Sequence, residues 1–314
     1  MKAFYTDVFV LPLPDGHRFP MRRYSLLRET ILQQGILESH QLEIPDGATE
    51  SQLQLVHAPE YIRRVFEGEL SADEQRRIGF PWSPQMVERS RRSVGATIAG
   101  TAAALTEGLG INLAGGTHHA FTDRGAGYCV FNDVAVAIRV HQQQGRVGRA
   151  VIIDGDVHQG DGTAAIFRDD PSVFTTSLHA KKAFPARKQV SRLDVELDPG
   201  ADDVTYLAGL DRLLDGIPSD ESFDIAYYLA GADPYEGDTL GGLKVTKAGL
   251  RERDRRVFTF CRQHGWPVVM AMAGGYAADY RDIVEIQATT IATAREILMP
   301  SRGSDSDAES RSGS

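Results

Sequence analysis

Short apolar runs alternate along the chain with longer segments whose apolar residues recur at helical spacing. Runs of this length, bounded by turn residues, predict buried β-strands. We expect six of them, at Ala3–Val10, Ile111–Ala114, Ala150–Ile153, Ser172–Leu178, Phe223–Ala230 and Val268–Ala273. The clearest helical segments are 84–106, Phe131–Gln144, 247–264 and Tyr280–Ile297.

Two of these helices begin with recognisable start signals. Ser83 is a good N-cap residue followed by Pro84 at the first helical position, and Thr246 is a second N-cap residue. Apolar strands that alternate with helices favour an α/β fold with a mainly parallel central sheet and helices on both faces. Without a repeat or a clear linker, residues 1–300 are predicted to form one domain. The tail 301–314 has no apolar residue larger than alanine and is predicted to be disordered.

The composition is that of an ordinary globular protein. Of 314 residues, 42% are hydrophobic and 25% are charged. A net charge of -9 without clustered Lys and Arg argues against nucleic-acid binding, and no apolar stretch is long enough to span a membrane. The first apolar run is broken by Asp7 and two prolines, so it predicts a strand and not a signal peptide. Two cysteines without a CxxC motif favour a reducing, cytoplasmic setting.

Reactive side chains follow directly after four of the predicted strands. Open parallel sheets bind ligands at the carboxyl ends of their strands, so residues at these positions converge. They are His118 and His119, the run from Asp154 to Asp161, Asp233, and Tyr276, each close to glycine. Independent accidents would not all fall at strand ends, and we therefore predict one active site at this edge of the sheet.

The run AVIIDGDVHQGDG (Ala150–Gly162) carries the strongest of these signals. It places Asp154, Asp156, His158 and Asp161 within eight residues of one another. Unpaired, these groups would cost too much desolvation at the edge of a core. Aspartate oxygen and imidazole nitrogen suit zinc, and a mixed set of nitrogen and oxygen ligands is typical of catalytic zinc. Alone, the run also fits a solvated turn, just as Asp233 fits a turn and Tyr276 a packed aromatic residue.

Together the motifs resemble the histone deacetylase family. The matching runs are Gly115–Asp133, Ile152–Gly162, Thr175–His179, Ala230–Leu243 and Ala273–Tyr276. Glu236–Gly249, the Phe184-Pro185 pair and the short chain look most like the class IV branch and its bacterial relatives. Asp161 departs from that branch, which often carries asparagine there. The resemblance implies the arginase/deacetylase fold.

The resemblance also implies a role for each site residue. One catalytic Zn²⁺ would be bound by Asp156, His158 and Asp233. Catalysis would involve His118, His119 and Tyr276, with Asp154 and Asp161 behind the two histidines. A structural K⁺ would be bound by the carbonyl groups of Asp154, Asp156 and His158, together with Ser177. The substrate tunnel would be lined by Gly127, Tyr128, Phe184 and Gly275, with Arg23 near a cavity below the metal.

The implied reaction is hydrolysis of an N-acyl amide, with acyl-lysine in a protein or peptide as the first candidate substrate. Acetyl and long fatty-acyl groups both stay open. A deacylase of small amines such as acetylpolyamines is an alternative, which acidic loops at the tunnel mouth would favour. An arginase-like binuclear manganese hydrolase would need more carboxylate ligands. An inactive acyl-lysine-binding module would lack a ligand, a histidine or the tyrosine.

Overall fold

One eight-stranded parallel sheet forms the centre of the molecule. The computed structural model describes residues 1–14, 16–218 and 221–300. The strands follow the order β2-β1-β3-β8-β7-β4-β5-β6, and each paired neighbour is parallel. Their bounds are β1 Lys2–Phe4, β2 Leu42–Glu43, β3 Leu109–Asn112, β4 Ala150–Asp154, β5 Val173–Ala180, β6 Leu193–Leu197, β7 Ile225–Leu229 and β8 Val268–Ala271.

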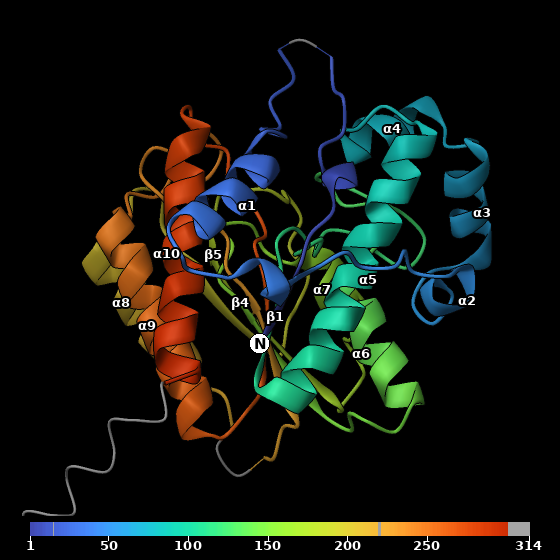
Figure 1. Cartoon of the computed structure of the whole chain (residues 1–314). Coiled ribbons are helices and arrows are strands. Elements are labelled where there is room, and N and C mark those ends of the chain that lie inside the picture. The colour runs from blue at the N-terminus through green and yellow to red at the C-terminus, as the bar shows by residue number, and fades with distance from the viewer. Residues whose placement is uncertain (15, 219–220, 301–314) are drawn as a thin grey trace, which may run out of the picture.

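Helices cover both faces of this sheet (Figure 1). On one side lie α1 (Arg23–Gln33), α8 (Asp203–Asp215), α9 (Lys247–Gln263) and α10 (Tyr280–Leu298). On the other lie α5 (Pro84–Glu107) and α6 (Asp133–Gln143), with the short helices α2 (Glu50–Leu53), α3 (Pro59–Glu67) and α4 (Ala72–Ile78) beyond them. Helix α7 (Asp161–Ile166) follows β4. Every residue of β3, β4, β7 and β8 is buried, as expected for strands with both faces covered.

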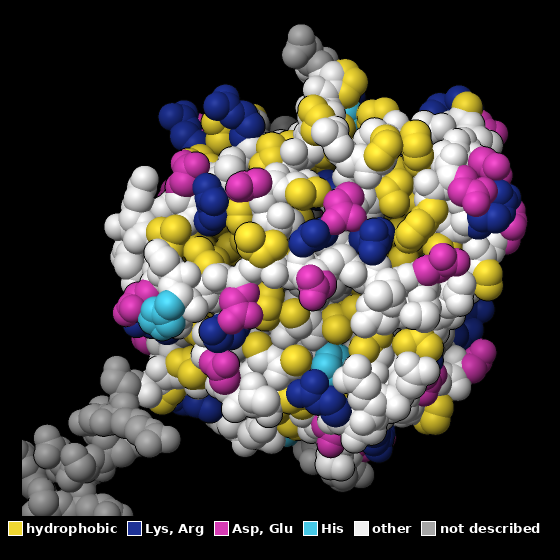
Figure 2. Space-filling model, turned by 45° about the vertical axis from the view of Figure 1, so that its right-hand side comes forward, with side chains coloured by type: hydrophobic (Ala, Val, Ile, Leu, Met, Phe, Trp, Pro, Cys, Tyr) yellow, Lys and Arg dark blue, Asp and Glu magenta, His cyan; other side chains and the backbone are white. Residues whose placement is uncertain are grey.

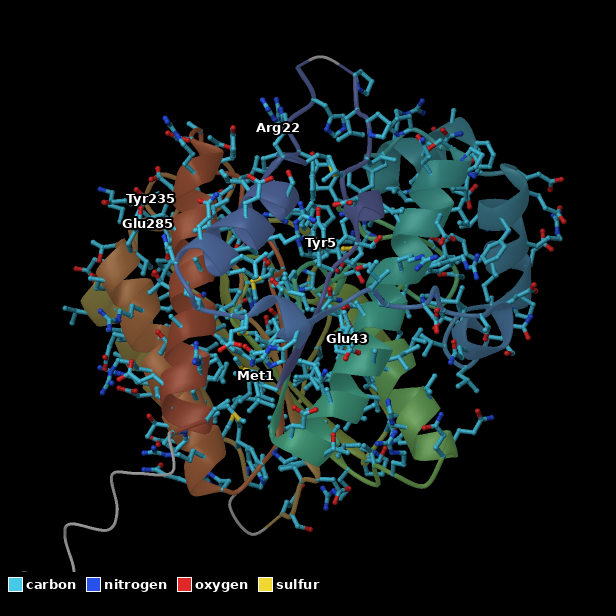
Figure 3. All side chains as sticks on the ribbon, in the orientation of Figure 1. Met1, Tyr5, Arg22, Glu43, Tyr235 and Glu285 are labelled. Carbon is cyan, nitrogen blue, oxygen red and sulfur yellow. The ribbon has the colours of Figure 1, made fainter. Side chains whose placement is uncertain are left out.

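The parallel arrangement places all carboxyl strand ends at one edge. In Figure 3 Met1 lies low in the view and Tyr5 lies above it, so β1 runs upward; Arg22, just before α1, lies near the upper end. Acidic and basic side chains are interspersed over the face drawn in Figure 2. Among the described residues, none of the helices combines the length and the apolarity needed to cross a membrane.

The predicted α/β class and its parallel sheet are confirmed, and so are the four helices. Ser83 caps α5 by accepting a hydrogen bond from the amide of Met86 at 3.1 Å, and Thr246 caps α9 by accepting from the amide of Gly249 at 3.0 Å. The strand predicted at Ala3–Val10 is wrong beyond Phe4. A 3₁₀ helix, η1 (Asp7–Phe9), follows instead, because Thr6 caps its first turn.

Two edge strands and several short helices are additions to the prediction. β2 has only two residues, and β6 alternates buried and partly exposed side chains. A second 3₁₀ helix, η2 (Ser39–Gln41), precedes β2. The predicted disorder of residues 301–314 concerns a segment outside the described residues.

Helix α5 and strand β3 pack backbone against backbone, which gives a test of the fold. A Cβ atom at Gly110 would lie 1.9 Å from the carbonyl oxygen of Gly100, whereas a Cβ at Gly100 would meet Val269 at an ordinary 3.6 Å. Gly110→Ala should therefore lower the free energy of unfolding by about 1–3 kcal/mol or more. Gly100→Ala should change it by less than about 1 kcal/mol, toward stability, because alanine favours helix. Urea unfolding compares the two, and equal effects would contradict this packing.

Candidate active site and metal centre

The loops that follow four adjacent strands meet at the carboxyl edge of the sheet. The strands are β3, β8, β7 and β4, which are neighbours in this order. Their loops bring together the residues that the sequence singled out: His118 and His119 after β3, Tyr276 after β8, Asp233 after β7, and Asp156 and His158 after β4. All of these side chains are buried except that of Tyr276, which is partly exposed.

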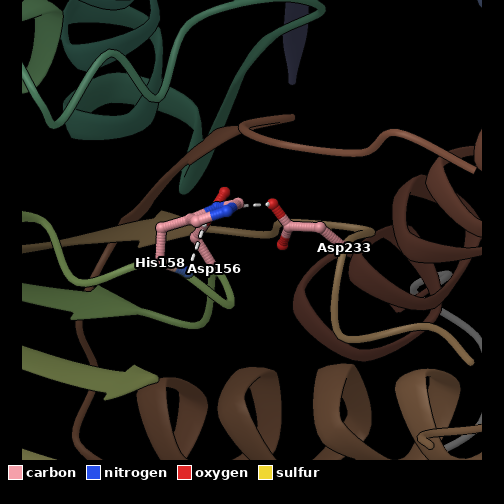
Figure 4. A group of neighbouring side chains, drawn as sticks. All are labelled: Asp156, His158 and Asp233. Atoms are coloured by element: carbon pink, nitrogen blue, oxygen red, sulfur yellow. Dashed lines mark hydrogen bonds and ion pairs between the residues drawn. The ribbon is translucent and has the colours of Figure 1, made fainter. Parts of the chain in front are cut away.

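Asp156, His158 and Asp233 form a cluster of potential metal ligands (Figure 4). One ligand atom from each of the three lies within 4.8 Å of the other two. His158 Nδ1 lies 3.0 Å from Asp156 Oδ1 and 3.2 Å from Asp233 Oδ2. The imidazole therefore stands between two carboxylates at the bottom of the site.

The charges in this cluster fit a cation. Burial and the charge of Asp156 raise the pKa of Asp233 to about 7. Burial lowers the pKa of His158, but the two carboxylates outweigh it and raise that pKa to about 10. The buried Asp233 Oδ2 is paired with His158 Nδ1 at 3.2 Å, but it accepts no well-aligned hydrogen bond from a described residue. A divalent cation would compensate both carboxylates and use this oxygen, and the mixed nitrogen and oxygen donors suit zinc.

The turn after β8 crosses directly over the two carboxylates. The amide of Gly274 donates a hydrogen bond to Asp156 Oδ2 at 2.8 Å. A Cβ atom at Gly274 would lie 2.0 Å from Asp233 Oδ2 and 2.5 Å from Asp156 Oδ2. The close approach requires glycine here, which explains one glycine of the run Ala273–Tyr276.

His118 and His119 each form a pair with a buried aspartate. His118 Nδ1 lies 2.7 Å from Asp154 Oδ2, and His119 Nδ1 lies 2.7 Å from Asp161 Oδ1. The two Nε2 atoms face each other at 3.2 Å. Each aspartate carboxylate accepts a hydrogen bond from the Nδ1 atom of its histidine. The Nε2 atoms are therefore the ones that can act on a substrate in the cavity.

The two histidines differ in protonation. Burial lowers the pKa of His118, but Asp154 and Asp156 outweigh it and raise the pKa to about 9. At His119, burial and the charge of His118 lower the pKa to about 4, against the opposing effect of Asp161. At pH 7 the pair holds one positive charge, on His118. His119 is neutral and keeps a lone pair on Nε2.

Tyr276 is fixed through its backbone by the loop that follows β7. Its amide donates to Asp238 Oδ2 at 2.5 Å, and its carbonyl accepts from the hydroxyl of Thr239 at 2.8 Å. Its ring centroid lies 6.2 Å from that of His158 and 5.8 Å from that of Tyr128. Burial raises the pKa of its hydroxyl well above the usual value, so the group stays protonated and can donate a hydrogen bond.

An outer cavity leads from the surface to the ligand cluster. Gly127, Tyr128 and Phe184 line it together with His119, His158 and Tyr276. The ring of Phe184 meets that of His119 edge-on at 4.8 Å. Tyr128 adopts a positive φ of 65°, an uncommon conformation for a residue with a side chain.

Below the outer cavity lies an inner cavity, which His118, Asp156 and Gly274 help to line. Gly275 was expected at the tunnel, but it lines neither of the two cavities. Its carbonyl instead accepts a hydrogen bond from Arg23 Nη1 at 2.8 Å. Arg23 is buried and lines the inner cavity below the cluster, where it also donates to the carbonyl of Ala273 at 2.9 Å. Ser177 is buried on β5 and pairs in register with Asp154 on β4.

A buried ion pair under the site was missed at the sequence level. Arg253 donates to the carbonyl of Gly231 at 2.5 Å and to that of Gly155 at 3.3 Å. It thereby ties together the loops that carry Asp233 and Asp156. Its Nε donates to Asp254 at 2.9 Å. Both charged residues lie on the buried, mostly apolar face of α9. Two adjacent charges at positions of a helix that otherwise carry apolar side chains could have indicated this ion pair from the sequence.

Fold and site together define an α/β protein with a candidate hydrolytic centre at the carboxyl edge of a parallel sheet. The chain belongs to the histone deacetylase family, because the histone deacetylase domain matches residues 17–291. The resemblance found in the motifs is thereby confirmed for the family. The comparisons do not single out the class IV branch, which stays a prediction.

Individual relatives agree with this assignment. An uncharacterized protein of Picosynechococcus sp. is 43% identical over 93% of this chain and 98% of its own length. Histone deacetylase 2 of Arabidopsis thaliana is 29% identical over 86% of this chain and 72% of its own. A solved histone deacetylase homologue in complex with SAHA has the same fold, with a TM-score of 0.82, 24% identity, and coverage of 95% of this chain and 88% of its own.

The ion pair under the site predicts a measurable coupling. Arg253→Met should lower the free energy of unfolding by about 3–5 kcal/mol, because it leaves the carboxylate of Asp254 buried without its cation. The double variant with Asp254→Asn should lose less than the sum of the two single variants. Urea unfolding of the four proteins measures this, and additive losses would refute the coupling.

Proposed function

We propose that this chain is a zinc-dependent amidohydrolase that removes acyl groups from acyl-lysine in proteins or peptides. One observation carries the proposal. The ligand cluster of Asp156, His158 and Asp233 lies next to two aspartate-supported histidines and a tyrosine, and His119, His158 and Tyr276 line both the outer and the inner cavity. This combination supplies ligands, a base and an oxyanion donor within a single site.

Asp156, His158 and Asp233 would hold one Zn²⁺. When bound, zinc polarises a carbonyl group and lowers the pKa of water to about 7. Three protein ligands leave positions for water and substrate, as in catalytic zinc sites. The cluster offers two carboxylates and one imidazole, which favours this single-metal site over the binuclear manganese alternative.

His119 would move the protons. It is neutral at pH 7, so Nε2 can accept a proton from the attacking water and later deliver it to the leaving amine. Asp161, bound to Nδ1, would hold the ring orientation and support the charge that forms. His118, paired with Asp154, would keep its proton and act through its charge.

Tyr276 would stabilise the carbonyl oxygen as negative charge develops on it. Its hydroxyl keeps its proton, and Asp238 fixes the backbone of its loop. The hydrogen-bond donor is therefore already in place, and little reorganisation of the protein accompanies the reaction. Tyr128 and Phe184 would hold the alkyl stem of the substrate lysine and exclude water. Hydrolysis of a linear amide follows from these roles.

A structural K⁺ is part of the proposal, bound by the carbonyls of Asp154, Asp156 and His158 with Ser177. The register that places Ser177 beside Asp154 supports it. A cytoplasmic location remains the expectation that follows from the cysteine content.

Two other functions fit less well. Acidic loops at the tunnel mouth would favour a deacylase of small cationic amines. The outer cavity is lined by Arg76 and Arg77, which would repel such amines. An inactive binding module would lack part of the catalytic set, whereas this chain retains all the matching residues.

Tyr276→Phe tests the oxyanion role. Removing this one hydroxyl should lower kcat on an acyl-lysine peptide by about 100- to 1000-fold, with the zinc content unchanged. Steady-state kinetics with metal analysis of the same preparation measures both. Turnover near that of the wild type would refute the role.

Asp156→Ala tests the ligand set. The variant should lose stoichiometric zinc and measurable turnover, because a carboxylate ligand is gone. Asp169→Ala, at an exposed position after α7, is the matched control and should keep both. Zinc is quantified after dialysis, with circular dichroism as the check on folding; Asp156→Asn serves if the alanine variant is unfolded. A full equivalent of zinc with full activity in either folded variant would contradict the assignment.

A further inference from the structure

Two arginines line the mouth of the outer cavity, although the chain as a whole is acidic. The net charge is -9, yet Arg76 and Arg77, in the last turn of α4, line this cavity beside Tyr128 and Phe184. Arg18 adds to this field, since its charge opposes the effect of burial on the pKa of Tyr128. The mouth therefore differs in charge from the average surface.

The two arginines are held at the mouth by the tunnel wall itself. The carbonyl of Arg77 accepts a hydrogen bond from the amide of Gly127 at 2.9 Å, and the carbonyl of Ile78 accepts from the amide of Tyr128 at 2.7 Å. The end of α4 is thus attached to the residues that line the tunnel. Both guanidinium groups belong to exposed residues, accessible to a substrate.

The segment that contributes Phe184 to the cavity is also rich in basic residues. The segment around Phe184 carries Lys181, Lys182 and Arg187, all exposed. Lys188 Nζ donates to the carbonyl groups of Ala183 and Pro185 on either side of Phe184, at 2.6 and 2.9 Å. Lys188 thereby closes the turn that carries Phe184.

Nearby acidic groups neutralise this rim only in part. Asp73 pairs with Arg76, whereas Arg77 has no ion pair with a described residue. Asp238, the acidic residue next to the mouth residue Leu240, is turned inward and accepts hydrogen bonds from three backbone amides. Within the described part of the chain, no ion pair involves Lys181, Lys182 or Arg187 either.

We propose that the mouth selects acyl-lysine in acidic segments, with aspartate or glutamate within a few residues of the modified lysine, and disfavours cationic amines. This inference rests on the proposed deacylase function and names its substrate class. A carboxylate beside the acyl-lysine would reach Arg76 or Arg77 once the acyl chain is in the tunnel. Exposed charges of this kind act mainly on encounter and orientation, and salt screens them.

A set of matched peptides tests the selectivity on the zinc-loaded full chain. The peptides share one acetyl-lysine and carry acidic, neutral or basic flanking residues, and acetylspermidine is added as a small cationic amide. We expect kcat/KM for the acidic peptide to exceed that for the basic one by about 3- to 10-fold at low salt. The ratio should shrink toward one at 0.5 M salt. Equal values, or acetylspermidine as the best substrate, would overturn the inference.

Charge reversal locates the effect. The double variant Arg76→Glu and Arg77→Glu should lose the preference for the acidic peptide or invert it. Arg146→Glu is the matched control, because Arg146 is exposed and lies just before β4, at the opposite edge of the sheet. It should keep the wild-type preference. An unchanged preference in the double variant would overturn the role of α4.

Binding of the same peptides, followed by fluorescence anisotropy, separates the two proposals. If acidic peptides bind more tightly but no peptide is hydrolysed, the deacylase function fails and the selectivity stands. If peptides are hydrolysed and neither binding nor turnover depends on the flanking charge, the selectivity fails and the deacylase function stands.

Discussion

Compensation of buried negative charge is the constraint on which the site depends. Several aspartates lie buried near the carboxyl edge of the sheet, where an unpaired carboxylate would cost several kcal/mol. Asp154 and Asp161 are paired with histidines, and Asp254 with Arg253. The buried oxygen Asp233 Oδ2 differs, because it accepts no well-aligned hydrogen bond from a described residue and only His158 pairs with it. Among the described buried carboxylates, the incompletely compensated oxygen therefore lies where a cation would bind.

The sequence could predict that these residues converge because each strand and the reactive residues after it are contiguous. A strand such as Ala150–Asp154 leads directly into Asp156 and His158, and parallel topology brings such strand ends together. The short strands at the edge were not predictable, since two residues of β2 carry no periodicity. The basic mouth was not predictable either, because Arg77 meets Gly127 only in the folded chain. The small-amine alternative depended on acidic loops at the tunnel mouth, where Arg76 and Arg77 lie.

Backbone strain lies in the same loops as the candidate chemistry. Two described residues other than glycine have positive φ angles, Tyr128 at 65° and Ala273 at 49°. Such conformations persist where the surroundings fix them. Tyr128 is fixed by the end of α4, and Ala273 by Arg23, which binds its carbonyl. The tunnel wall and the turn over the ligand cluster thus depend on contacts made outside the motifs.

Charge is layered from the mouth to the bottom of the cavity. The cluster at the bottom holds two carboxylates, whereas the rim carries Arg76 and Arg77. Under the proposed reaction, the substrate amide enters the tunnel without charge and the product lysine leaves it as a cation. The rim raises the free energy of that cation near the mouth but has little effect on a neutral amide. The same arginines that would attract an acidic segment would then also disfavour rebinding of the product amine, so selection and release would share one electrostatic origin.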